Sequence, residues 1–87
     1  MKHVLKIDNK FAKRIISREK NFEIRLNDRD FQTGDSVELY PNIKQGETLA
    51  CELITADIAY IHQDGYGMAQ GYVVLALKNI HWMEVSE

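Results

Sequence analysis

A short run of charged residues in the first third of the chain has the clearest potential for chemistry. Lys20 precedes a segment in which Glu23 and Arg25 alternate with apolar residues. Arginine presents a planar fork of donors that suits a phosphate or a base edge, and lysine presents a mobile point charge. Glu23 could accept a hydrogen bond from an exocyclic amine, or form an acid/base pair with Lys20. The alternative is that these charges pair with cross-strand neighbours and only stabilise the fold.

The net charge of −2 hides a strong asymmetry along the chain. The first 29 residues hold nine bases and four acids, whereas the rest holds two bases and nine acids. A body that is mostly acidic is poorly suited to coating DNA, which requires broad neutralisation of phosphates. A local basic face instead favours a limited, oriented contact with an anion. Pairing of the two halves within the fold is the competing explanation.

Other chemical constellations are not supported by the sequence. Three scattered histidines and one cysteine give no zinc spacing, so we expect no metal. Gly65 and Gly67 flank Tyr66 without the following helix that a dinucleotide fingerprint needs, so we expect no cofactor. Cys51 lies in an apolar stretch, where a buried and inert thiol is the usual outcome.

Composition and length favour one soluble domain over residues 1–87. No stretch reaches the roughly 18 apolar residues of a membrane helix, and Lys6 and Asp8 interrupt the apolar N-terminal stretch that a signal peptide would require. A single cysteine cannot form an internal disulfide. We therefore expect a cytoplasmic protein that does not bind membranes.

The elements that must position the charged run follow from periodicity. We predict a strand over residues 1–7, then Asp8 as the N-cap of an amphipathic helix over residues 9–18 with a basic outer ridge. Alternation predicts a strand over residues 22–26, with Phe22, Ile24 and Leu26 facing the core and Glu23 and Arg25 facing away.

The remaining two thirds of the chain reads as strands. We predict strands over residues 37–40 and 49–60, with a bend near Leu53, a glycine-rich loop over residues 62–71, a strand buried on both faces over residues 72–77, and a short strand over residues 80–82. The order β-α-β-β-β-β indicates an α+β fold, a small partly closed barrel packed by one N-terminal helix. The predicted core consists of Phe11, Ile15, Phe22, Ile24, Val37, Leu39, Val73 and Leu75.

Several stretches of the chain together resemble a known family. Residues 17–35 contain a small residue after the helix, Lys20, the Glu23-x-Arg25 strand and a Gly34-Asp35 turn. Outside this run, the matching segments are the opening His3-x-Leu-Lys-Ile, the loop at residues 27–31 and the Gly-Tyr-Val-Val at residues 71–74. This pattern resembles the ASCH branch of the PUA-like superfamily, in particular its small stand-alone members of unknown function.

The resemblance implies a PUA-like β-barrel with a cleft between the helix, the Glu23/Arg25 strand and the loop carrying Tyr66. It implies binding of RNA or a nucleotide, with Tyr66 stacking on an exposed base. On this basis the expected nucleic-acid-binding residues are Lys6, Lys20, Glu23, Arg25, Asn27, Arg29 and Tyr66.

Two alternatives stay open, so the sequence leaves undecided whether the protein is an enzyme. One ASCH branch resembles an amidohydrolase of acetylated cytidine, and Lys20 matches the lysine of that branch. The first alternative is therefore a hydrolase of modified nucleosides or RNA, with Lys20 and Glu23 as catalytic candidates. However, Glu23 stands where that branch has a threonine, and a carboxylate changes the chemistry. Arg18 also stands where that branch has a glycine, so we expect an altered turn into the strand. The other alternative is a protein-interaction module whose acidic half binds a basic partner.

Overall fold

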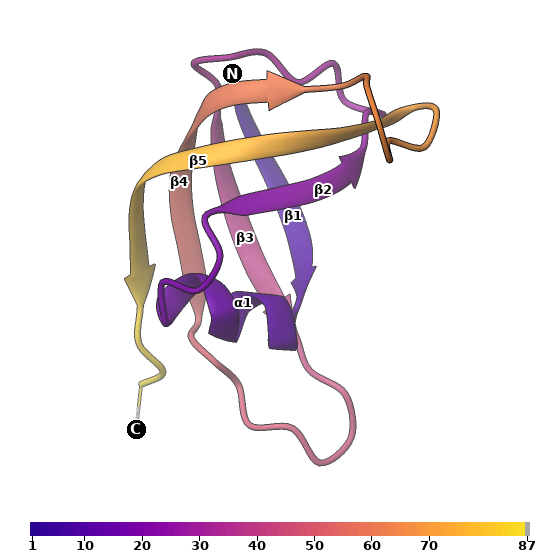
Figure 1. The fold of residues 1–87 in the computed structure, drawn as a ribbon. Coiled ribbons are helices and arrows are strands. Elements are labelled where there is room, and N and C mark those ends of the chain that lie inside the picture. Colours follow the sequence, from indigo (N-terminus) through magenta and orange to yellow (C-terminus); the bar gives the residue numbers. More distant parts are fainter. Residues whose placement is uncertain (87) are drawn as a thin grey trace.

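The computed structural model describes residues 1–86 and shows one curved sheet with one short helix (Figure 1). The elements in chain order are β1 (Lys2–Asp8), α1 (Asn9–Ile16), β2 (Phe22–Leu26), β3 (Ser36–Asn42), β4 (Leu53–His62) and β5 (Tyr72–Met83). The predicted order β-α-β-β-β-β and the coarse α+β class are therefore confirmed. Two parts differ: residues 49–52 were predicted as strand but precede β4, and residues 80–82 continue β5 and do not form a separate strand.

The five strands form a half-barrel that is open on one side. Their order in the sheet is β1-β3-β4-β5-β2, so β1 and β2 are its two edges. β1 runs parallel to β3, and the other neighbouring pairs are antiparallel. β4 and β5 bend strongly along their length (Figure 1). Register shifts between Thr55 and Asp57 and between Ile58 and Tyr60 accompany the bend, further along the chain than the predicted position at Leu53.

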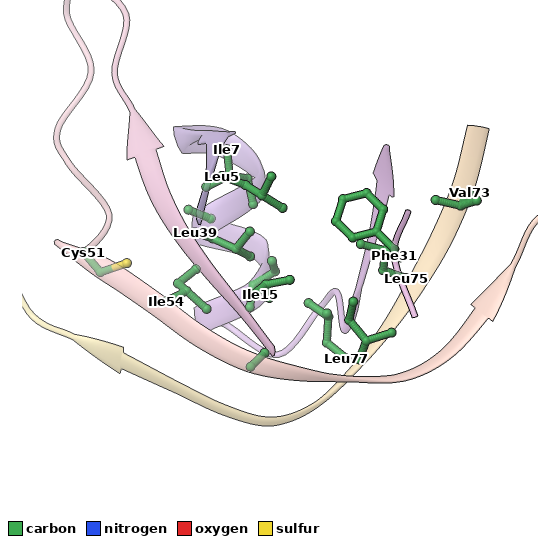
Figure 2. Packing of buried hydrophobic residues seen from close by; sticks show 14 residues of the cluster. Leu5, Ile7, Ile15, Phe31, Leu39, Cys51, Ile54, Val73, Leu75 and Leu77 are labelled. Atoms are coloured by element: carbon green, nitrogen blue, oxygen red, sulfur yellow. The ribbon is translucent and has the colours of Figure 1, made fainter. Parts of the chain in front are cut away.

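The core fills the inside of this curve, where α1 packs against the sheet (Figure 2). Ala12 and Ile15 of the helix are buried against side chains of β1, β3, β4 and β5. Five of the eight predicted core residues are buried, and Phe11 packs against the cluster while partly exposed. β5 buries only alternate residues, so the prediction that it is buried on both faces is wrong.

The orientation of β2 was predicted wrongly. Phe22, Ile24 and Leu26 point to solvent, whereas Glu23 is only 4 % exposed. Alternation correctly separates the two faces of the strand, but it does not say which face meets the interior. The apolar set was assigned to the core because a buried carboxylate is costly unless it is paired. Here Glu23 is paired, as described below.

The helix begins and ends differently from the prediction. Asp8 occupies the N-cap position, but its side chain makes no capping hydrogen bond. The neighbouring buried amide of Asn9 instead donates to the carbonyl of Thr48 and accepts from the amide of Ala50, each at 2.8 Å, which ties α1 to the segment before β4. The helix ends at Ile16 and not at residue 18, because Arg18 adopts a left-handed conformation with φ of 68°.

A polar cluster joins the start of β1 to the turn before β3. Asp35 accepts hydrogen bonds from His3 Nε2 at 2.8 Å, from the N-terminal ammonium of Met1 at 3.0 Å and from the amide of Gln32 at 3.0 Å. These partners, the His3 hydrogen bond first, lower the pKa of Asp35 from 3.8 to about 2. The ring of His3 also meets Phe31 edge-on, with centroids 4.7 Å apart. His3 and Asp35 are buried, and their contact ties the start of β1 to the turn before β3.

Candidate functional site

A cleft of about 720 Å³ lies along the open side of the half-barrel. It is bounded by the C-terminal end of β1, by α1 and the connection that follows it, and by β2. The residues that line it are Lys6, Ile7, Asp8, Phe11, Arg14, Glu19, Lys20, Phe22, Glu23, Ile24, Arg25, Leu26 and Tyr72. Its walls are therefore a mixture of cations, carboxylates and aromatic rings.

Glu23 holds two cations at the inner wall of the cleft. Its Oε1 accepts from Lys20 Nζ at 2.7 Å, and its Oε2 lies 3.3 Å from Arg25 Nη1. The side chains of Lys20 and Arg25 are 12 % and 25 % exposed, so they reach the surface of the cleft. The inward orientation of β2 creates this arrangement, because it places the carboxylate beneath both cations.

Lys20 is positioned from the helix as well as from the strand. Its backbone amide donates to the carbonyl of Arg14 at 3.0 Å, within the turn that closes α1. The left-handed conformation of Arg18 makes this turn possible. Glycine adopts this conformation without cost, so Arg18 occupies a turn whose backbone geometry favours glycine.

Arg25 spans the gap between the two edges of the sheet. Its Nη1 donates to the carbonyl of Lys6 in β1 at 2.7 Å. No ladder joins β1 to β2 in the described sheet, so this side-chain bond crosses the open side of the half-barrel. Arg25 therefore links β1 to β2 and forms part of the cleft wall.

The ring of Phe11 lies among three cations at the cleft. Lys20 Nζ is 4.4 Å from the ring centroid, Lys10 Nζ is 5.0 Å away, and Arg14 Cζ is 5.7 Å away. Lys20 also lies 5.3 Å from the ring of Phe22. These distances fall within the range of cation–π contacts.

Part of this positive charge is not neutralised within the described chain. Within residues 1–86, no carboxylate lies within ion-pair distance of Lys6, Lys10 or Arg14. Two further carboxylates line this part of the cleft, Asp8 and Glu19, and Glu19 accepts a hydrogen bond from the hydroxyl of Ser17 at 2.7 Å. Lys6 and Arg14 in the cleft, and Lys10 beside the ring of Phe11, are therefore cations available to an anion.

The backbone of β2 adds polar groups to the cleft. The bonds from Leu77 N to Asn21 O and from Asn27 N to Gly71 O show which residues of this segment pair with β5. In an antiparallel pair, residues whose N–H and C=O bond to the partner strand alternate with residues whose N–H and C=O point away from it. The N–H and C=O groups of Phe22 and Ile24 therefore point to the open edge, where the cleft lies.

Four of the seven predicted binding residues meet at this cleft, namely Lys6, Lys20, Glu23 and Arg25. The other three lie outside it. Asn27 Oδ1 accepts from the amide of Phe31 at 3.2 Å, and Arg29 Nε lies 3.9 Å from Asp28 Oδ1. Tyr66 projects into solvent from the loop between β4 and β5.

Four residues of the cleft that carry chemistry were not predicted as site residues, and one of them, Phe11, was assigned only to the core. Arg14 was visible as part of the basic helix ridge, but the ridge had no assigned partner. Phe22 was placed in the core, and Tyr72 was read only as the start of a strand. Aromatic residues in strands are normally packed inward, so the sequence offers no local signal that these two face a cleft.

No group of three or more His, Cys, Asp and Glu side chains within residues 1–86 is arranged to hold a metal ion. No helix of that part of the chain is long and apolar enough to cross a membrane.

The fold and the cleft together define a small α+β half-barrel domain with a charged, aromatic-lined groove between its sheet edges. The chain belongs to the family described as a domain of unknown function, DUF3850, whose sequence profile matches residues 2–77. This match extends from β1 into β5 and includes every cleft residue. No curated protein matches the chain.

Proposed function

We propose that this domain binds RNA or a nucleotide in the cleft, as a member of the ASCH branch of the PUA-like superfamily. The observation that carries the proposal is the Phe11 ring, with Lys10, Arg14 and Lys20 within 6 Å of it at the edge of the cleft. An aromatic face beside several cations offers a stacking partner for a base and charge for a phosphate.

The dimensions and polarity of the cleft fit this ligand class. Its volume of about 720 Å³ lies within the roughly 300–1,000 Å³ of small-molecule sites. Lys6, Lys10 and Arg14 supply donors for phosphate oxygens. Glu23 retains acceptor capacity on both oxygens, because each carboxylate oxygen can accept more than one hydrogen bond. It could therefore accept from the exocyclic amine of adenine or cytosine.

A binding experiment with a matched pair of variants tests the proposal. Nucleoside monophosphates and a short single-stranded RNA are titrated against the wild type, Arg14→Ala and Lys13→Ala at low and moderate salt. Arg14 lines the cleft, whereas the neighbouring Lys13 lies on the same helix and does not. We expect Arg14→Ala to weaken binding roughly tenfold or more, because a charge-assisted hydrogen bond contributes about 1.5–3 kcal/mol.

The RNA titration should also respond to salt in a specific way. Loss of one phosphate contact reduces the slope of log affinity against log salt by about one, and Lys13→Ala should leave the slope unchanged. Equal losses in the two variants would assign the effect to general electrostatics and not to the cleft. Absence of binding at low salt would contradict the proposal.

A hydrolase of modified nucleosides is the second candidate, favoured by the 2.7 Å contact between Lys20 and Glu23 in a mostly buried wall. A lysine in such an ion pair acts as a cation and a hydrogen-bond donor, so in a reaction it would stabilise developing negative charge, and Glu23 would accept a proton. Incubation with acylated nucleosides distinguishes the candidates. Turnover that is present in the wild type and absent in Lys20→Ala would favour the hydrolase, and binding without turnover would favour the first proposal.

A further inference from the structure

The outer face of β4, β5 and β2 is an apolar surface that no part of the described chain covers. Antiparallel pairing places Phe22, Ala76 and Tyr60 in one row, and Ile24, Val74 and His62 in the next. Leu26 and Tyr72 form a third row. Paired residues of neighbouring strands share a face. All eight are exposed or half-buried, and Ile24 near the centre is 56 % exposed.

We call the surface formed by these eight residues the β2–β5–β4 face. None of the eight is a lysine, arginine, aspartate or glutamate. Charged residues make up 28 % of the chain, so their absence from eight adjoining exposed or half-buried positions is unusual. A contiguous apolar patch on the surface of a soluble domain marks an interaction site. The eight side chains supply no cation of their own, and Lys20, whose Nζ is 5.3 Å from the Phe22 ring, is held at the cleft by Glu23. This argues against RNA as the occupant of the face, since binding of a nucleic acid requires neutralisation of its phosphates.

A second copy of the chain satisfies the chemistry of this face. In an interface with two-fold symmetry, the same patch meets itself, so any charge near the axis would face its own copy and repel it. The β2–β5–β4 face has no such charge, and its mixture of aromatic and aliphatic side chains matches the apolar centre of protein interfaces. Pairing through the open edge of β2 is the other route to a dimer, but Arg25 already spans that edge to the carbonyl of Lys6 at 2.7 Å.

We infer that the protein forms a homodimer through the β2–β5–β4 face, with a two-fold axis near Ile24. The patch spans three strands, so it supplies the apolar centre of an interface and leaves the polar rim to the surrounding residues. A stable interface of standard size covers about 800 Å² on each partner, and the chain exposes 6004 Å² in total. Four of the eight residues, Phe22, Ile24, Leu26 and Tyr72, also line the cleft, so the partner lies beside its mouth. This inference does not depend on the proposed ligand.

Sedimentation equilibrium of the full chain tests the inference over protein concentrations from roughly micromolar to millimolar. We expect the mass of the wild type to rise with concentration from 10.1 kDa toward twice that value. Ile24→Lys should remain monomeric at every concentration, because it places two like charges at the axis. The control is Val4→Lys, since Val4 is 50 % exposed on the other edge strand, and it should associate as the wild type does.

A second variant separates dimerisation from the cleft. Tyr60 belongs to the β2–β5–β4 face but does not line the cleft, so Tyr60→Lys should also weaken association while leaving nucleotide binding by the monomer unchanged. Circular dichroism confirms that each variant folds. A wild type that stays monomeric at the highest concentration would overturn the inference, as would association of Ile24→Lys equal to that of Val4→Lys. Either result leaves the nucleotide proposal intact, because the mass is measured without ligand.

Discussion

Glu23 provides the sharpest test of the cleft wall. The carboxylate is 4 % exposed and holds Lys20 at 2.7 Å and Arg25 at 3.3 Å, so Glu23→Ala leaves two cations without their partner. Breaking a fully buried ion pair costs about 3–5 kcal/mol. Since Lys20 and Arg25 keep 12 % and 25 % of their side-chain exposure, water can solvate them in part. We therefore expect a loss of about 2–3 kcal/mol in the free energy of unfolding, somewhat below the fully buried range.

Urea denaturation followed by circular dichroism measures this loss. The control is Glu38→Ala, which removes the 3.3 Å pair with Lys2 at the surface and should cost at most about 1 kcal/mol. Combining Glu23→Ala with Lys20→Met should recover part of the loss, with a coupling energy of about 1–3 kcal/mol. A Glu23→Ala protein that is as stable as Glu38→Ala would refute the buried position of this carboxylate.

Three further outcomes follow from other parts of the fold. The pKa of Asp35 is lowered to about 2 in the folded protein, so as pH falls the unfolded chain binds a proton at Asp35 before the folded chain does. The stability that Asp35 contributes should therefore be lost as pH falls from about 4 to about 2. Unfolding free energies measured across that range should show no such loss from this position in Asp35→Asn. Arg18→Gly should raise the free energy of unfolding by about 1 kcal/mol, because a left-handed conformation costs a non-glycine residue about 1–2 kcal/mol. An unchanged or lower melting temperature of this variant would contradict the prediction. Burial raises the pKa of the Cys51 thiol, so a thiol reagent should label the folded protein only at the rate of its unfolding, and rapid labelling without denaturant would be inconsistent with the packing.

The sequence predicted the inner strands well because their patterns leave little choice. Val37 and Leu39 alternate with Glu38 and Tyr40, so only one face can be apolar, and both residues are buried. The same argument holds for Ile15 on the amphipathic helix. In these elements the local pattern and the position in the fold agree.

Long-range contacts account for what the sequence did not predict. The amide of Asn9 bonds residues about forty positions away, and this partnership has no local signature. The bond from Arg25 to Lys6 likewise depends on the meeting of two sheet edges that are distant in sequence. Tyr66 was assigned to the cleft because its loop is rich in glycine. That loop connects β4 to β5, and the only residue from this part of the described chain that lines the cleft is Tyr72.

The reversed orientation of β2 connects the cleft with the outer apolar face. Exposing Phe22, Ile24 and Leu26 forgoes up to about 1.5–3 kcal/mol of burial for each side chain, and burying Glu23 requires two cations to hold it. A strand turned the other way would avoid both costs. Departures from the usual pattern of this kind concentrate at functional positions and are compensated by other interactions. On the inner side the compensating groups are Lys20 and Arg25, which the carboxylate holds at the cleft. On the outer side Phe22, Ile24 and Leu26 stay exposed in the described chain, so the orientation of one five-residue strand sets both the charged wall of the cleft and the apolar outer face.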